Sequence, residues 1–236
     1  MPGAPDSVRV TQPADRPYRF LVLVASLFTG TLVVSNIVAV KISDFGGHYL
    51  DSGNIVFPVS YILGDILTEV YGYRQARRII WSAFLANALA VGVIVAAGEL
   101  PAAPFWEDQE SYDAILGQAW RIVAASFVAF LVGEFTNSAV LSRLKVYTRG
   151  RFLWLRTISS TLIGQGLDSV LFVTIAFAGT GIPDLHVLIW ETWIFKVAFE
   201  AIATPVTYLV VGRLKRAEGV DTYDEGVDLN PVLVWQ

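Results

Sequence analysis

The sequence predicts an all-α integral membrane protein with six transmembrane helices and both termini in the cytoplasm. Hydrophobic residues make up 54% of the 236 residues and charged residues only 16%, whereas soluble domains carry about a quarter charged residues. The mean hydropathy is +0.54, and one core cannot bury so many apolar side chains while leaving a surface compatible with water. The apolar residues also gather in windows of spanning length, with basic residues between alternate windows.

Six apolar windows account for the predicted helices. A helix rises about 1.5 Å per residue, so about 20 apolar residues cross a hydrocarbon core of about 30 Å. The weakest window, 53–73, contains Asp65 and Glu69, and it is counted because omitting it would place the basic loops on opposite sides. The six windows are residues 20–40, 53–73, 79–98, 122–141, 157–182 and 187–211.

The basic residues set the predicted orientation. Fourteen of the 17 Lys and Arg residues precede the first window, follow the last, or lie in alternate connections. By the positive-inside rule, this distribution places both termini in the cytoplasm. Residues 1–17 are expected to form a disordered tail, 18–216 the membrane domain, and 217–236 an acidic tail that is disordered over 218–228. Pro58 and Pro205 lie inside windows and are expected to bend their helices.

Composition excludes several classes of function. The net charge of -4 provides no basic face for nucleic acid. The chain has no Cys and only two His residues, so thiolate chemistry and the usual metal motifs are ruled out, and neither a metal nor a cofactor is expected. It also lacks the Gly-rich phosphate loop G-x-x-x-x-G-K-[ST], so it should not hydrolyse nucleotides itself. The expectation is a transporter and not an enzyme, although an intramembrane enzyme using two carboxylates stays open as an alternative.

Ionisable side chains at membrane depth are the main candidates for a functional site. Each costs about 2.5–3.5 kcal/mol to insert, so it is usually retained for function. Lys196 and Glu200 are one helical turn apart, so they share a helix face and can neutralise each other. Glu69 lies near the cytoplasmic end of its window, where water or Arg74 could satisfy it. The ionisable residues inside windows at or near mid-membrane depth are Asp65, Glu134, Asp168, Lys196 and Glu200.

Three windows share a pattern in which Gly precedes an acid or amide and a second polar residue follows three positions later. The pattern begins at Gly64, Gly133 and Gly164, and it includes Asn137 and Gln165. The i, i+3 spacing puts both polar groups on one helix face, and Gly lets another backbone approach. Either the patterns bind helices together, or they line one polar cavity between four helices. Asn36 could line the same cavity, and Trp193 could stack on a planar ligand.

Residues 60–77, which read SYILGDILTEVYGYRQAR, resemble the signature of the queuosine precursor transporter family, which is grouped with vitamin-uptake transporters. Further matches are VSNI at 34–37, GEFTN at 133–137, GQGLDS at 164–169 and residues 196–205. The resemblance covers about residues 20–216. Its Gly-Asp-x-x-Thr-Glu-x-Tyr-Gly block is specific, whereas the other motifs are weaker individually but occur in the expected order.

The resemblance implies a multi-pass importer in the bacterial inner membrane. It would carry 7-cyano-7-deazaguanine and 7-aminomethyl-7-deazaguanine, which are salvaged to make queuosine in tRNA. A carboxylate can accept from the adjacent N1–H and 2-amino donors of a deazaguanine, and Asn, Gln or Lys can donate to its carbonyl. The implied binding residues are Asn36, Asp65, Glu134, Asn137, Gln165, Asp168, Trp193, Lys196 and Glu200.

Three questions stay open from sequence. The solute could instead be another small planar molecule, such as a vitamin or nucleobase. Energy could come from a gradient, with Asp168 or Glu134 as a proton site, or from downstream consumption of the substrate after facilitated diffusion. A partner ATPase could also supply it, which would make the chain a binding subunit. The expected partners are the lipid bilayer and a purine-like small molecule, with no nucleic acid, and a homo-oligomer is left open.

Overall fold

Five long helices form a bundle in the computed structural model, which describes residues 18–39, 41–44, 49–116, 120–177 and 185–233. Each is long and apolar enough to cross a membrane. They correspond to five of the six predicted windows, and most extend beyond the uncharged stretch. The helices are α1 (Leu21–Val38), α3 (Tyr73–Gly98), α5 (Trp120–Tyr147), α6 (Leu153–Phe177) and α7 (Leu185–Glu218).

The outer surface of the bundle is apolar. Large hydrophobic side chains such as Leu23 on α1, Leu89 on α3 and Ile202 on α7 are 56%, 68% and 79% exposed. Many polar and charged side chains are buried instead. An inside that is partly polar and an outside that is apolar suit a chain surrounded by lipid.

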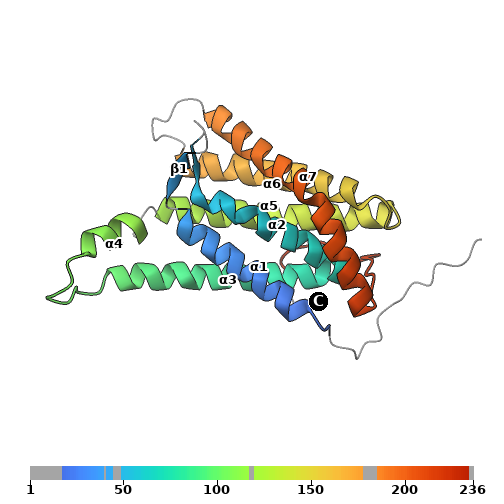
Figure 1. Cartoon of the computed structure of the whole chain (residues 1–236), viewed down its shortest axis with the longest axis horizontal. Helices are drawn as coiled ribbons and strands as arrows, with labels where there is room; N and C mark the ends of the chain where they lie inside the picture. The colour runs from blue at the N-terminus through green and yellow to red at the C-terminus, as the bar shows by residue number, and fades with distance from the viewer. Residues whose placement is uncertain (1–17, 40, 45–48, 117–119, 178–184, 234–236) are drawn as a thin grey trace, which may run out of the picture.

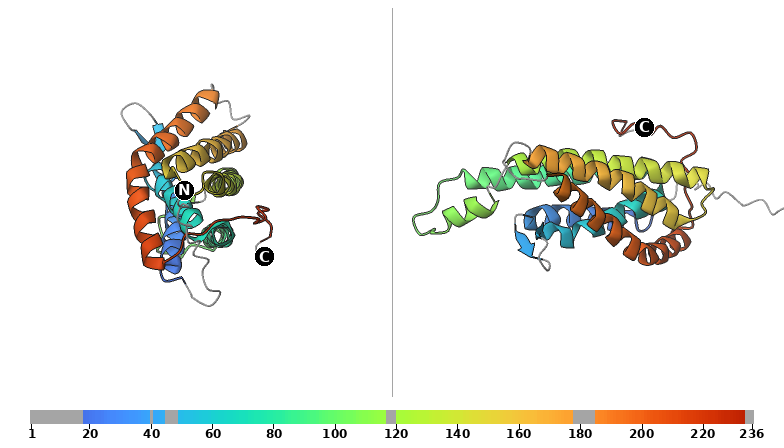
Figure 2. Two further views of the ribbon diagram at one scale, coloured as in Figure 1. Left: turned by 90° about the vertical axis from the view of Figure 1, so that its right-hand side faces the viewer. Right: turned by 90° about the horizontal axis from the view of Figure 1, so that it is seen from above.

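The remaining predicted window forms a shorter element at the centre of the bundle. The α-helix α2 (Phe57–Ile66) continues directly into one turn of π-helix, η2 (Leu67–Tyr71). Together they are 15 residues long, which is short for a full crossing, and α2 packs against α1, α5 and α7. Pro58 lies in the first turn of α2, where its missing N–H costs nothing, so the predicted bend there is wrong. Pro205 lies inside α7, which changes direction partway along its length (Figure 2).

The helices α5 and α6 pack closely along their length (Figure 1). A Cβ atom on Gly133 would lie 2.8 Å from the Cβ of Asp168, and one on Gly164 would lie 2.7 Å from the Cβ of Asn137. Both distances are too short for a real contact, so the two glycines allow the close approach of the helices. They also bring the polar residues next to them into the interface.

The two ends of the bundle differ. At one end, on the right in Figure 1, α1, α3 and α6 begin and η2, α5 and α7 end, and we call this the terminal end. The other end carries the 3-10 turn η1 (Ser52–Ile55), the short helix α4 (Gln109–Leu116) and a hairpin of strands β1 (Ile42–Asp44) and β2 (Tyr49–Asp51). The sequence did not predict this hairpin, although its two strands leave the fold predominantly helical.

The acidic segment after α7 is ordered, which corrects the expectation of disorder over 218–228. We call residues 219–233 the strap, because they run back across the terminal end and along α3. Tyr73 Oη donates to the carbonyl of Leu229 at 2.8 Å, and Trp81 Nε1 donates to that of Pro231 at 2.8 Å. The strap therefore satisfies polar side chains of α3 that would otherwise lie unpaired.

Candidate functional site

Polar side chains from four helices meet in the middle of the bundle and form a central cluster. Each is at most 8% exposed. Its members are Asp65 on α2, Glu134 and Asn137 on α5, Gln165 and Asp168 on α6, and Lys196 and Glu200 on α7. The structure thus brings seven of the nine predicted binding residues together, and their role in binding stays a prediction.

Asp65 links α2 to α5. Its Oδ1 accepts a hydrogen bond of 2.7 Å from Asn137 Nδ2 on α5. Next to it, a side chain at Gly64 would overlap the carboxyl group of Glu134, so glycine is needed there. The Gly-Asp pair of α2 therefore lies against the carboxyl group of Glu134 and the amide of Asn137 on α5.

Lys196 forms an ion pair with Asp168 across the interface between α7 and α6. Its Nζ also lies 5.6 Å from the centre of the Tyr61 ring on α2, a distance suited to a cation–π contact. Among the described residues, Lys196 therefore pairs with Asp168 and not with Glu200, the partner that helical spacing allowed. Asp168 lies on a neighbouring helix, so spacing along one helix could not predict that it pairs with Lys196.

The central cluster is rich in hydrogen-bond acceptors that have no donor. Both carboxyl oxygens of Glu134, Oδ1 of Asn137 and Oε1 of Gln165 are buried and unpaired among the described residues. A buried polar atom without a partner costs about 1–3 kcal/mol, so such atoms call for an explanation. A cluster of this kind can bind a small molecule that presents several N–H donors.

The other two predicted binding residues lie apart from these contacts. Asn36 on α1 is half-buried and donates to the carbonyl of Leu32 in its own helix at 3.1 Å. Trp193 donates to the carbonyl of Leu162 at 3.0 Å and packs against Gly166 of α6. Both contacts are typical of helix packing, and neither residue contacts a member of the central cluster through them.

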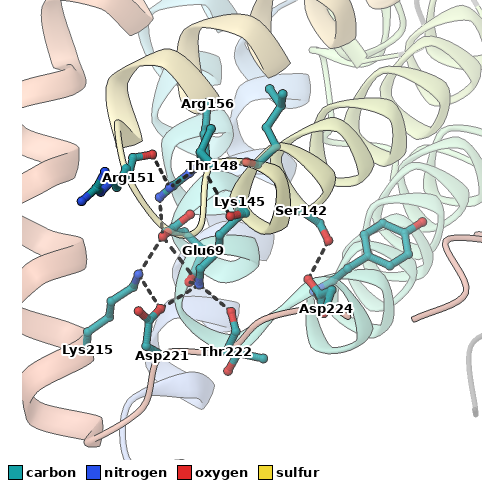
Figure 3. Close-up of polar contacts among 12 residues, drawn as sticks. Glu69, Ser142, Lys145, Thr148, Arg151, Arg156, Lys215, Asp221, Thr222 and Asp224 are labelled. Carbon is teal, nitrogen blue, oxygen red and sulfur yellow. Dashed lines mark hydrogen bonds and ion pairs between the residues drawn. The ribbon is translucent and has the colours of Figure 1, made fainter. Parts of the chain in front are cut away.

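A second buried polar group lies at the terminal end and is centred on Glu69 of η2 (Figure 3). Oε1 of Glu69 accepts from Arg156 Nη2 at 2.7 Å and from Lys215 Nζ at 2.6 Å, and it lies 3.6 Å from Lys145 Nζ. These three cations come from α6, α7 and α5. Glu69 is only 1% exposed. We call Glu69, Lys145, Arg156 and Lys215 the basic hub.

The basic hub replaces two sequence-based expectations. Glu69 is neither near water nor paired with Arg74, which is exposed. Lys145, Arg156 and Lys215 were assigned to basic loops or helix ends, whereas the structure turns them inward. The sequence did contain a signal for this group. Basic residues recur near the cytoplasmic ends of the last three windows, and Glu69 is an acid near the cytoplasmic end of the weakest window.

The strap completes the terminal end. Oδ1 of Asp221 lies 2.9 Å from Lys145 Nζ and 2.7 Å from Lys215 Nζ (Figure 3). Partial burial raises the pKa of Asp221, but the hydrogen bonds from both lysines outweigh that effect and hold its pKa below the ordinary value. Asp224 accepts from the backbone N–H of Tyr73 at 2.9 and 3.1 Å and from Ser142 Oγ at 2.7 Å, so it caps α3.

Comparison with known proteins adds independent information. A family described as "Putative vitamin uptake transporter" matches residues 51–210, which include the whole central cluster. A "Probable queuosine precursor transporter" of Bacillus subtilis (strain 168) is 30% identical over 181 residues, covering 75% of this chain and 78% of the relative. The "Queuosine precursor transporter" of Escherichia coli (strain K12) is 29% identical over 64% of this chain and 66% of its own length. A similarly named Haemophilus influenzae protein is 26% identical over 60% of this chain and 57% of its own. No solved structure is significantly similar to the chain.

Proposed function

Since the chain belongs to the queuosine precursor transporter family, we propose that it imports 7-cyano-7-deazaguanine and 7-aminomethyl-7-deazaguanine across the bacterial inner membrane. The observation that supports these substrates is the set of unpaired acceptors in the central cluster. A deazaguanine carries N1–H and 2-amino donors on one edge, and the aminomethyl compound adds an ammonium group. An acceptor-rich site satisfies these donors.

The proposed binding mode assigns the guanine edge to Glu134. Both of its carboxyl oxygens are unpaired among the described residues, so it can accept two parallel hydrogen bonds. Asp168 is less suited to this role because Lys196 already pairs with it. Oδ1 of Asn137 and Oε1 of Gln165 would accept from the remaining donors, and the ring of Tyr61 would face the bicycle.

The proposed topology has six spans, with α2 and η2 together as the short inner one. The terminal end would face the cytoplasm, because the basic hub and the exposed arginines Arg143, Arg149 and Arg151 lie there. The end with α4 would face outward, where its acidic residues would contact the periplasm. With no nucleotide-binding loop in the sequence, the chain would work as a secondary transporter by alternating access.

The test is uptake of labelled 7-cyano-7-deazaguanine by bacteria that lack both their own synthesis of queuosine precursors and their importer. Expression of this chain should restore uptake and queuosine in tRNA. Excess unlabelled deazaguanine should compete, whereas a vitamin or a nucleobase that lacks the guanine edge, such as adenine or uracil, should not. If one of these other solutes blocks uptake instead, that solute is the substrate of the site. No uptake at a normal expression level would refute the proposal.

A matched pair of variants tests the site. Glu134→Gln should reduce uptake at least about tenfold, because loss of a buried charged contact to a ligand costs about 2–5 kcal/mol. Glu110→Gln changes an exposed carboxylate on α4 in the same way and should leave uptake unchanged. Equal uptake by the two variants at equal membrane levels would show that Glu134 does not bind the substrate.

A further inference from the structure

The strap crosses the terminal end over the same elements that carry the central cluster. The cluster lies on α2, α5, α6 and α7, and the basic hub joins η2, which continues α2, to α5, α6 and α7. Glu69 follows Asp65 by four residues, and Lys145 follows Asn137 by eight. At a rise of about 1.5 Å per residue, the hub therefore lies about 6–12 Å beyond the cluster. A molecule that leaves the cluster between these helices toward the terminal end must pass the hub and the strap.

The two ends of the strap are fixed to parts of the bundle other than α5. The strap begins directly after α7, to which it is joined through the chain. Farther along, Arg77 Nη1 on α3 donates to the carbonyls of Asp228 and Asn230 at 3.1 and 2.7 Å. Together with the bonds from Tyr73 and Trp81, these contacts hold residues 228–231 against α3.

The middle of the strap, residues 221–224, closes over the hub. Lys145 Nζ donates to the carbonyl of Thr222 at 2.5 Å and to that of Glu69 at 2.6 Å, so one ammonium group joins the strap to η2. A Cβ atom on Gly72 would lie 2.7 Å from Thr222 Cγ2, so the strap packs directly on the joint between η2 and α3. Figure 3 shows Asp221 and Thr222 facing the lysines of the hub.

Part of the middle is held by contacts that can open readily. The side chains of Asp221 and Lys215 are 45% and 21% exposed, and ion pairs open to water are weak. The hub beneath differs, since Glu69 and Arg156 are each 1% exposed. Gly219, the first residue of the strap, has a φ of +69° and nothing within 4 Å of an added Cβ atom, so the backbone has room to turn there. The middle can therefore lift while both ends of the strap stay attached.

Asp224 is the contact that keeps the middle closed. Its carboxylate accepts from Ser142 Oγ on α5 at 2.7 Å and from the backbone N–H of Tyr73 on α3 at 2.9 Å. It is 5% exposed, so water does not replace these bonds while the strap is down. Because one carboxylate joins the strap to both helices, α5 and α3 can separate at this end only when Asp224 leaves one of them.

We propose that residues 221–224 form a gate that closes the central cluster from the cytoplasm in this structure and lifts once in each transport cycle. This proposal rests on the proposed function and its orientation, and it adds the part of the chain that moves. Asp221 and Asp224 would lose their partners on α5 when the gate opens. Residues 228–231 would stay on α3 and keep the strap beside the exit.

The test locks the strap with a reversible crosslink. The chain has no cysteine, so an introduced pair reacts alone. Ser142→Cys with Asp224→Cys places two thiols where a hydrogen bond of 2.7 Å joins α5 to the strap. A short bis-methanethiosulfonate reagent bridges them, and a thiol reductant removes the bridge. Ser43→Cys with Ser52→Cys is the matched control, because its hydrogen bond of 2.6 Å lies in and beside the hairpin at the other end.

Exchange of labelled for unlabelled 7-cyano-7-deazaguanine is measured with the full-length protein in liposomes. Both double variants should exchange the substrate before bridging. Bridging residues 142 and 224 should slow exchange at least about tenfold per bridged molecule, because the gate must open in every cycle, and reduction should restore it. Bridging the control should change nothing. The affinity of the protein bridged at 142 and 224 for the substrate in detergent should stay the same, because the bridge contacts no member of the cluster.

Hydrogen–deuterium exchange of the unmodified chain gives a second measurement that needs no variant. The backbone N–H of Tyr73 is bonded to Asp224, so it becomes free to exchange when the gate lifts. With substrate on both sides of the membrane, this amide should exchange faster than without substrate. Residues 228–231 should show no change, since they stay on α3.

The outcomes separate the two proposals. Unchanged transport after bridging residues 142 and 224 overturns the gate and leaves the proposed function intact, and so does an unchanged deuterium exchange of Tyr73. Loss of substrate affinity in the bridged protein also overturns the gate, because the strap would then shape the site itself, as does an equal loss of transport in the bridged control. A parent that does not exchange the compound overturns the proposed function, and the gate with it.

Discussion

Replacement of Glu69 by glutamine removes the carboxylate that Arg156, Lys215 and Lys145 share at the terminal end. Arg156 and Lys145 are each 1% exposed, so water cannot take the place of that carboxylate. Removing one partner of a buried ion pair costs about 3–5 kcal/mol, because a buried charge is left uncompensated. We expect Glu69→Gln to destabilise the protein by about that amount.

Asp221→Asn is the matched comparison. Asp221 contacts two of the same cations, Lys145 and Lys215, but its side chain is 45% exposed. Ion pairs open to solvent contribute about 0–1 kcal/mol, so this variant should lose no more than that. Each variant loses one carboxylate charge, yet we expect Glu69→Gln to lower the free energy of unfolding clearly more than Asp221→Asn.

The assay is thermal unfolding of the purified protein in detergent, followed by the amount that stays monodisperse. For a chain of this length, 1 kcal/mol corresponds to about 2–4 °C, so Glu69→Gln should lower the midpoint by about 6–20 °C. Adding Arg156→Met to Glu69→Gln should recover part of the lost stability. Replacing both partners of a buried ion pair destabilises a protein less than removing one partner and leaving the other charge buried. A midpoint for Glu69→Gln within error of that for Asp221→Asn would refute the reasoning.

Three further predictions test other contacts. Asp224→Ala removes the cap on the N–H of Tyr73 and should cost about 1–2 kcal/mol in the same unfolding assay, whereas no change would mean that the strap adds no stability. Gly164→Ala should cost about 1–3 kcal/mol by overpacking the interface of α5 and α6, while Gly30→Ala, with nothing within 4 Å of the added methyl group, should be neutral or slightly stabilising. Equal midpoints for these two glycine variants would contradict the close packing. Lys196→Met leaves the buried carboxylate of Asp168 unpaired, so it should cost about 3–5 kcal/mol in the same unfolding assay, and an unchanged midpoint would mean that the ion pair adds no stability.

The sequence predicted the long helices well because their signal is local. An uncharged run such as 79–98 must be buried in lipid whatever surrounds it. The cost of an ionisable group in a membrane is equally local, so Asp65, Glu134 and Glu200 could be identified as buried from their windows alone. The hairpin β1–β2 and the π turn η2 have no comparable signal in the chain.

The partners of these groups could not be predicted in the same way. Helical spacing pairs Lys196 with Glu200, but the packing of α6 against α7 brings Asp168 to the lysine. Residues 218–228 were predicted to be disordered because five acids lie close together there, a pattern typical of solvated tails. Two of them, Asp221 and Asp224, find their donors on helices 70 or more residues earlier in the chain.

The basic hub also constrains how the protein is made. Glu69 pairs with Arg156, 87 residues later, and with Lys215, 146 residues later. At about 5–20 residues per second, the ribosome needs roughly 7–30 s to add Lys215 after Glu69. During that interval the carboxylate must remain in the translocon or be neutralised by a proton. Glu218, which accepts from the backbone N–H groups of Arg19 and Phe20 just before α1, is made later still. The two ends of the chain thus close the fold together, after translation has passed the last helix. Pulse-labelled chains should become protease-resistant only once residues beyond 218 have been released.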